Sequence, residues 1–250
     1  MHIHIFTLFP QMFQGPFHHS IVDRAKNAGL VQIHVHDIRE YTHDRHHVAD
    51  DSQFGGGSGM VMKPEPIFEG VESVLADLTQ LEMARTRVIL TSPQGRLLNQ
   101  NLVKELSQQL HLVLICGHYG GVDERIKQHL ITDEISIGDY VLSGGEPAAI
   151  AVTDAVVRLL PGAVGSAASV QGDSITSGLL QHPIYTRPSR FRQWEVPEIL
   201  LSGNHLEIER WRRQRSLERT FRCRPEMLGK IRLTSEELLY LKTLGYKGYP

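Results

Sequence analysis

Short runs of apolar residues, or of alternating apolar and polar residues, recur through the first half of the chain. They cover residues 3–8, 31–35, 88–90 and 112–116, and such runs are typical of strands. Among them, residues 99–110 place apolar side chains at helical spacing. Because strands that alternate with helices generally form one parallel sheet, we predict an α/β fold whose sheet is largely parallel.

Glycine and polar residues follow strands at three places. The segments are residues 91–96, 116–125 and 136–146, which read TSPQGR, CGHYGGVDER and SIGDYVLSGGE. Open α/β sheets bind ligands beside the carboxyl ends of their strands. We therefore expect the three segments to line one shared pocket.

A fourth glycine cluster, FGGGSG, begins at Phe54. A phosphate-binding loop needs a strand before it and a helix after it, and no strand is predicted in front of this cluster. We therefore predict a mobile loop or lid rather than a phosphate site. The preceding His43, His46 and His47 lack the spacing of a metal-binding helix, so the sequence favours solvated histidines over metal ligands.

The composition is that of an ordinary globular protein. With 41% hydrophobic and 22% charged residues among 250, the chain has room for a buried core and for two domains. Cys116 and Cys223 are too few for a disulfide framework or a cysteine-based zinc site. The first residues lack the features of a signal peptide, so we expect a cytoplasmic protein without membrane attachment.

Small, flexible and polar residues become frequent near residue 160. This change predicts a larger N-terminal domain over residues 1–160, a flexible linker or lid over 161–178 and a shorter C-terminal domain over 179–250. Asp173 is the only charged side chain between Arg158 and Arg187. A lone carboxylate there suggests a group delivered to a site on closure, although an Asx turn or a helix cap explains it equally well.

The C-terminal part is basic, although the whole chain holds 26 Lys plus Arg against 28 Asp plus Glu. Residues 201–232 carry nine basic and four acidic side chains. If one helix spans them, Arg212, Arg215, Arg219 and Arg222 form a single stripe. Because the planar guanidinium group suits phosphate, the stripe favours contact with an RNA backbone over a solvated face with ordinary ion pairs.

Acidic residues near the three strand-end segments restrict the ligand that they could bind. Asp123, Glu124, Asp139 and Glu146 would repel a pyrophosphate, whereas a nucleoside without phosphates is compatible with them. S-adenosylmethionine is such a ligand, because its sulfonium cation tolerates nearby acids. Each turn alone is explained by an ordinary strand-to-helix connection, but the three together make a nucleoside pocket an equally good interpretation.

Six motifs that follow one another along the chain resemble those of one known family. They read GGGSGMVMKPEP, SPQGR, CGHYGGVDERI, SIGDYVLSGGE, DSITSGLLQHPIYTRP and LLSGNHLEIERWR. In this order and spacing, the chain resembles the bacterial tRNA (guanine-N1)-methyltransferases that modify guanosine 37 beside the anticodon. The resemblance covers nearly the whole chain. It implies a SPOUT-type parallel sheet with a deep trefoil knot that binds S-adenosylmethionine, a smaller all-helical domain that helps to hold tRNA, and a homodimer with a shared active site.

The resemblance also implies roles for individual residues. Asp173 is expected to act as the general base that removes the proton from guanine N1, and Arg158 to stabilise the negative charge that develops on O6. The residues expected to bind the methyl donor are Pro93, Gly117, Tyr119, Ile137, Gly138, Asp139, Tyr140, Val141, Leu142, Gly144 and Gly145. The expected RNA contacts are Arg187, Ser202, His205, Arg212, Arg215, Arg219 and Arg222.

Some positions depart from the family pattern. Gly120 stands where many members have glutamate, and Ser177 and Gln181 stand where many have aspartate. Their absence puts an accessory acidic network in doubt, and a role for Mg2+ stays open.

Two other functional interpretations are considered from the residues alone. A nucleotide-dependent α/β enzyme would carry a GxGxxG turn between a strand and a helix, which this sequence lacks in that context. A non-catalytic RNA-binding protein would use only the arginine-rich region, and it would leave Asp173, Arg158 and the three strand-end segments without a role.

Overall fold

The computed structural model describes residues 1–165 and 173–248 of the chain. The chain divides into two compact units, Met1–Gly165 and Ser166–Pro250. Among the described residues, no helix is both long and apolar enough to cross a membrane.

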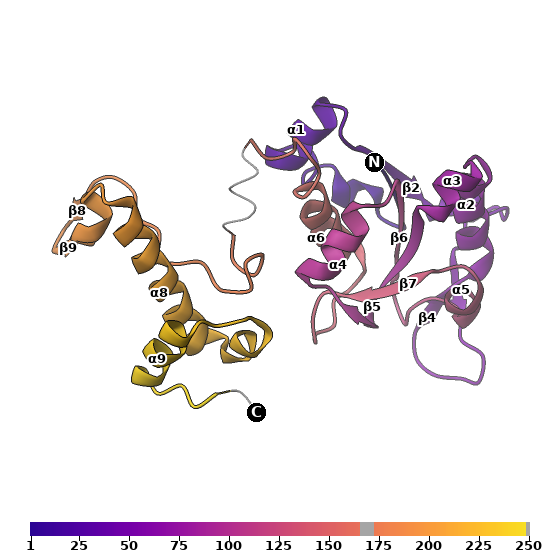
Figure 1. Cartoon of the computed structure of the whole chain (residues 1–250). Coiled ribbons are helices and arrows are strands. Elements are labelled where there is room, and N and C mark those ends of the chain that lie inside the picture. The colour runs from indigo at the N-terminus through magenta and orange to yellow at the C-terminus, as the bar shows by residue number, and fades with distance from the viewer. Residues whose placement is uncertain (166–172, 249–250) are drawn as a thin grey trace. The chain divides into compact units, whose positions relative to one another are not determined.

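The first unit is built on one parallel sheet with helices on both faces (Figure 1). The strand order is β2–β1–β6–β5–β7, and every neighbouring pair is parallel. The α/β fold predicted for this part of the chain is therefore confirmed. The strands are β1 (His2–Thr7), β2 (Gln32–Asp37), β5 (Thr86–Leu97), β6 (His111–Cys116) and β7 (Asp133–Ser136).

Two apolar clusters hold the helices to the two faces of this sheet. Ile3 and Ile5 of β1 point to the face that α1, α4 and α6 cover, while Phe6 points to the face that α2 and α5 cover. The central strand β6 is buried along its whole length, as expected of a parallel strand covered on both sides. The helices are η1 (Pro10–Phe13), α1 (Ser20–Asn27), η2 (Ile38–Tyr41), α2 (Pro64–Ala76), α3 (Gln80–Ala84), α4 (Gln100–Ser107), α5 (Glu124–His129) and α6 (Glu146–Val157).

Strand β5 continues beyond the short run that the sequence predicts. Its pairing with β7 shifts register between Thr91 and Arg96, so the predicted TSPQGR turn is an irregular extension of the strand. Gly95 permits this extension, because a Cβ atom there would lie 2.3 Å from the backbone between Glu134 and Ile135. The extension carries the end of β5 past the end of β6.

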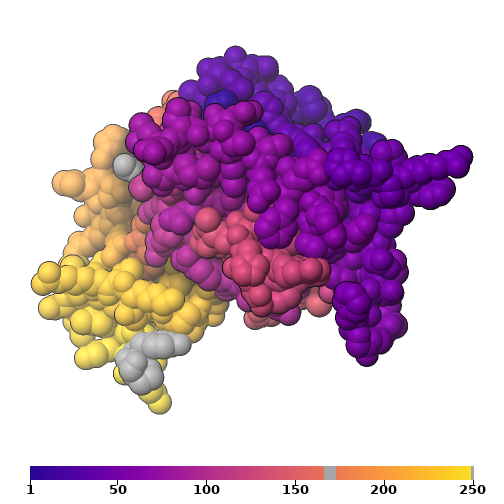
Figure 2. Space-filling model, turned by 90° about the vertical axis from the view of Figure 1, so that its right-hand side faces the viewer, coloured from indigo at the N-terminus to yellow at the C-terminus, as the bar shows by residue number. Residues whose placement is uncertain are grey.

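The glycine cluster at residues 54–59 joins two short antiparallel strands, β3 (Asp50–Ser52) and β4 (Met60–Met62). The expectation that no strand precedes the cluster is therefore wrong, and the polar sequence of β3 explains why the pattern did not reveal it. Gly55, Gly56, Gly57 and Gly59 adopt positive φ angles, which glycine reaches at little cost. Figure 2 shows this purple loop projecting from the surface of the first unit.

The second unit is mainly helical, with a small core formed by Leu179, Leu217, Leu228, Leu241 and Tyr246. Its helix α8 begins after Asn204, whose side chain accepts a hydrogen bond from the Glu207 amide and so caps the helix. The prediction that the C-terminal domain is all-helical is wrong, because β8 and β9 pair as a short antiparallel hairpin. The elements are β8 (Arg190–Phe191), β9 (Trp194–Glu195), η3 (Glu198–Leu201), α8 (His205–Cys223), η4 (Pro225–Lys230) and α9 (Ser235–Thr243).

A column of stacked imidazole rings lies on the sheet face that α2 covers. The ring centroids of His4 and His34 are 4.8 Å apart, and those of His2 and His111 are 4.9 Å apart. His36 continues the column, with 3.1 Å between its Nε2 atom and Nδ1 of His4. Burial, reinforced by the neighbouring histidines, lowers the pKa of His4 to about 3. Burial also lowers the pKa of His2, His36 and His111.

We predict that this column makes the fold sensitive to acid. Below pH 6.5 the unfolded chain takes up protons at these histidines, whereas the folded chain keeps His4 neutral until about pH 3. The free energy of unfolding should therefore fall as the pH drops through this window. In urea titrations, His4→Phe should lose less stability between pH 7 and pH 5 than the wild type does.

The control is His129→Phe, which replaces an exposed histidine outside the column. It should lose as much stability over this interval as the wild type. An equal loss in His4→Phe and the wild type would contradict the assignment of acid sensitivity to the column.

Candidate active site

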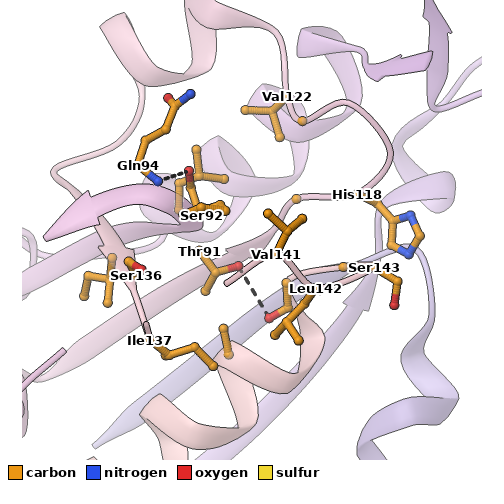
Figure 3. Close-up of a pocket in the computed structure, with 18 of the residues that line it drawn as sticks. Thr91, Ser92, Gln94, His118, Val122, Ser136, Ile137, Val141, Leu142 and Ser143 are labelled. Carbon is orange, nitrogen blue, oxygen red and sulfur yellow. Dashed lines mark hydrogen bonds between the residues drawn. The ribbon is translucent and has the colours of Figure 1, made fainter. Parts of the chain in front are cut away.

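A cavity of about 430 Å³ lies at the carboxyl ends of β5, β6 and β7 (Figure 3). Its walls come from residues 90–94, 117–122 and 135–145, with Asp139 excepted, together with Glu124, Lys127 and Ala148. The three strand-end segments therefore line one cavity, as the sequence predicted. Its volume lies in the range of pockets that bind small organic ligands.

The backbones of two of these segments approach each other closely. The Gly145 amide donates a hydrogen bond to the Gly117 carbonyl over 2.8 Å. The Thr91 hydroxyl donates to the Ile115 carbonyl over 3.1 Å and lies 3.4 Å from the Gly145 carbonyl. A Cβ atom on Gly145 would lie 2.1 Å from the Thr91 hydroxyl oxygen and 2.9 Å from Cα of Cys116. Only glycine fits this contact, which joins the ends of β5 and β6 to the start of α6.

The loop after β7 forms a tight turn that is held by its own polar groups. Gly138 has a φ angle of +156°, and its amide donates to the Ser136 hydroxyl over 3.2 Å. The Tyr140 hydroxyl donates to the Ile137 carbonyl over 3.2 Å. Tyr119, with a φ angle of +58°, turns the loop after β6. Both tyrosine side chains are exposed, so the cavity has two aromatic rings at its walls.

The cavity offers little positive charge to a phosphate group. Lys127 is the only lysine or arginine among its lining residues, and its Nζ atom lies 3.0 Å from the Glu134 carboxylate and 2.6 Å from Oε1 of Gln94. Of the four acids expected nearby, only Glu124 lines the cavity. Asp123 instead pairs with Arg125, which lowers the pKa of Asp123. The site therefore suits a ligand without phosphates.

The cavity gathers every residue predicted to bind a methyl donor except Asp139. Asp139 lies between two lining residues of the same turn. The sequence did not single out several polar lining side chains, although all lie within or beside the three identified segments. In Figure 3 these include Thr91, Ser92, Gln94, His118, Ser136 and Ser143.

Comparison with known proteins establishes the family. The family model described as "tRNA (Guanine-1)-methyltransferase TrmD" matches residues 1–230. The chain belongs to this family. As a member of the tRNA (guanine-N1)-methyltransferases it is an enzyme, which confirms the resemblance and sets aside the two other interpretations.

Curated relatives carry the same name. The tRNA (guanine-N(1)-)-methyltransferase of Dehalococcoides mccartyi is 54% identical over 237 residues, which cover 95% of this chain and 94% of the relative. The relative from Halalkalibacterium halodurans is 51% identical, with 95% of each chain covered. The relative from Staphylococcus epidermidis is 49% identical, with 97% of each chain covered.

The two predicted catalytic residues of this methyltransferase lie in different units. Arg158 follows α6 in the first unit, and its amide donates to the Asp154 carbonyl over 3.0 Å. Asp173 is partly buried and begins a turn in the second unit that packs Leu179 into the core there. Residues 166–172 of the predicted linker lie outside the described residues. The catalytic roles of Arg158 and Asp173 stay predictions.

Gly120, where the resemblance leads us to expect a glutamate, is closely packed. Its amide donates to the Met60 carbonyl over 2.8 Å, and a Cβ atom on Gly120 would lie 2.9 Å from the same oxygen. A glutamate here would therefore require a shift of strand β4. Gln181 stands where the resemblance leads us to expect an aspartate. Its backbone carbonyl accepts a hydrogen bond from the Arg219 guanidinium over 2.9 Å.

The arginine stripe lies along α8 as predicted, but acids compensate part of its charge. Arg212 lies 2.6 Å from Glu209, and Arg215 and Arg222 both pair with Glu218. The alternative of ordinary ion pairs on a solvated face is thus partly correct. The Arg212–Glu209 pair is exposed and so contributes little to stability, whereas Glu218 is only 14% exposed and holds Arg215 and Arg222 in a partly buried cluster.

The five arginines predicted to contact RNA line two hollows in the described part of the second unit. Arg187 and Arg212 line a hollow of about 350 Å³, and Arg215, Arg219 and Arg222 line another of about 450 Å³. His205 is exposed at the start of α8. Ser202 has a local structural role, because its hydroxyl accepts a hydrogen bond from the Asn204 amide.

We predict that Gly145→Ala destabilises the first unit and deforms the cavity. The added methyl group would meet Thr91 and the backbone of Cys116, and overpacking of this kind costs about 1–3 kcal/mol. Urea denaturation should show a lower midpoint, whereas Gly15→Ala, with no atom within 4 Å of its added Cβ, should leave the midpoint within error. Equal midpoints for Gly145→Ala and wild type would contradict the close contact.

Proposed function

We propose that this methyltransferase transfers the methyl group of S-adenosylmethionine to N1 of guanosine 37 of tRNA, beside the anticodon. The observation that carries the proposal is the single cavity at the strand ends, which contains every predicted donor-binding residue except Asp139. Family membership supports the tRNA substrate, and the motifs quoted above support the position in the tRNA and the donor.

The cavity residues fit a nucleoside that carries a cation and no phosphate. Exposed rings of Tyr119 and Tyr140 can pack on an adenine ring, and Ile137, Val141 and Leu142 give apolar surface beside them. Lys127 is already engaged by Glu134 and Gln94, so no free cation repels a sulfonium group. When bound, S-adenosylmethionine would supply an electrophilic methyl group on its sulfur atom.

The chain's own residues would make guanine reactive. Guanine N1 carries a proton and is a poor nucleophile until a base removes that proton. We assign this step to the Asp173 carboxylate, while the Arg158 guanidinium stabilises the negative charge that develops on O6. Holding the guanine base in line with the donor supplies much of the remaining acceleration.

The proposal includes a homodimer in which Asp173 of one subunit serves the donor cavity of the other. The separation of Arg158 and Asp173 between two compact units is compatible with such sharing. We further propose that the first unit carries the deep trefoil knot of the SPOUT class and that the second helps to hold tRNA.

Mg2+ is left out of the mechanism, because Gly120 and Gln181 lack the carboxylates of other members. A cytoplasmic location stays a prediction.

Asp173→Asn tests the assignment of the base. The amide cannot accept the N1 proton, so transfer of labelled methyl to unmodified tRNA with guanosine 37 should fall by a factor of about 100 or more. Affinities for donor and tRNA, measured by calorimetry, should stay close to those of the wild type.

The control is Glu198→Gln, which removes an exposed carboxylate of the same unit and should leave the rate unchanged. Equal rates for Asp173→Asn and wild type would remove Asp173 as the base while keeping the methyltransferase. Label at another nucleotide would contradict guanosine 37 as the target.

Gly117→Ala tests the donor cavity without disturbing the fold. A Cβ atom there would make only ordinary contacts, the shortest being 3.6 Å to the Thr91 carbonyl oxygen, yet Gly117 lines the cavity. The thermal midpoint should stay close to that of the wild type, while the KM for S-adenosylmethionine should rise about tenfold, which corresponds to about 1.4 kcal/mol. Unchanged donor affinity in a folded variant would place the donor elsewhere.

A further inference from the structure

The β8–β9 hairpin of the second unit exposes two large aromatic side chains. Phe191 is 58% exposed and Trp194 is 56% exposed. Their ring centroids are 6.1 Å apart and their planes are inclined by 30°. All residues from 184 to 195 are exposed, so these rings stand on a projecting segment. Exposed apolar groups gathered in this way mark an interaction site more often than chance exposure.

Arg192 adds a third flat group beside the two stacked rings, so that the three groups lie about equally far from one another. Its guanidinium carbon lies 5.2 Å from the centroid of Phe191 and 5.9 Å from that of Trp194. Arg192 occupies the turn with a φ angle of +57°, a region that residues other than glycine rarely adopt. A hydrogen bond from the Val196 amide to the Ser189 carbonyl, over 2.9 Å, closes the base of the hairpin. The hairpin therefore holds the three groups together.

The charge around the stack favours RNA over protein as the partner. Residues 184–197 contain Arg187, Arg190 and Arg192 but only one acid, Glu195. Glu195 lies 3.5 Å from Arg190 and so compensates one of the three positive charges. Unpaired bases stack on aromatic rings and on guanidinium planes, while arginine attracts the phosphates beside them.

The hairpin also adjoins the surface predicted to contact tRNA. Ser189 and Val196, at its base, line the same hollow of about 350 Å³ as Arg187 and Arg212. A nucleic acid strand lying in this hollow would therefore pass the base of the hairpin. The base of the hairpin and Arg212 of the arginine stripe therefore border the same hollow.

We propose that the Phe191–Arg192–Trp194 stack binds an unpaired base of the tRNA substrate. This inference rests on the proposed role of the second unit in holding tRNA and names the residues that read a single-stranded part of it. The stack positions the substrate and takes no part in proton or methyl transfer. Its loss should therefore raise the KM for tRNA and leave kcat at saturating tRNA unchanged.

Fluorescence gives a direct test, because Trp194 and Trp211 are the only tryptophans of the chain. In the full-length Trp211→Phe variant, emission comes from Trp194 alone, and unmodified tRNA transcript should quench it in a saturable manner. In the otherwise unchanged chain, Trp194→Ala and Phe191→Ala should each raise the KM for tRNA about tenfold. Trp194→Phe should recover most of the affinity because the phenyl ring also stacks.

The matched control is Leu206→Ala, which removes an apolar side chain that is 84% exposed in the same unit. It should leave the KM for tRNA unchanged. An unchanged KM in Trp194→Ala, or constant Trp194 emission at tRNA concentrations that saturate the enzyme, would overturn the inference. The hairpin would instead be assigned to contact with a second copy of the chain if tRNA left the Trp194 emission of the Trp211→Phe variant constant and the Trp194→Ala protein dissociated into smaller species.

The inference and the proposed function can fail separately. Saturable quenching by tRNA that receives no methyl group at guanosine 37 would support the stack and contradict the proposed target. Methylation at guanosine 37 with an unaltered KM for tRNA in both alanine variants would support the proposed target and contradict the role of the stack.

Discussion

The close backbone contact at Gly145 determines how the cavity is built. Its amide reaches the Gly117 carbonyl at 2.8 Å, and the space where a Cβ would stand is filled by Thr91 and Cys116. This contact ties the start of α6 to the ends of β5 and β6, so the loop between β7 and α6 must close over the strand ends. The shape of the cavity is thus a consequence of main-chain packing at the strand ends.

Charge is divided between the two units in a way that suits two different ligands. The cavity of the first unit holds one lysine, which Glu134 and Gln94 engage, whereas the second unit presents arginines in shallow, solvent-exposed hollows. The cavity therefore presents little positive charge to a ligand, whereas the second unit presents guanidinium groups that would attract a polyanion. The near-neutral net charge of the chain conceals this division.

The sequence predicted the location of the cavity because glycine-rich turns follow strands whose parallel order is set by alternation with helices. It did not predict the continuation of β5, since the register shift at Thr91 depends on pairing with Ile135, far along the chain. Helical spacing favours the ion pair of Glu218 with Arg222, but it does not show that Arg215 shares the same carboxylate, because a helical projection places side chains on a face without choosing their rotamers. Individual roles such as that of Asp173 depend on substrate geometry, which residue spacing alone does not encode.

The buried groups at the strand ends restrict the chemistry that is possible there. Cys116 is fully buried, and its burial, with the nearby Glu146 carboxylate, raises the pKa of its thiol well above the usual value. Glu146, only 1% exposed, accepts a hydrogen bond from the Thr7 hydroxyl over 2.7 Å and so joins the end of β1 to the start of α6. A protonated, inaccessible thiol cannot act as a nucleophile. Any nucleophile or base for the reaction proposed above must therefore come from a group other than the Cys116 thiol.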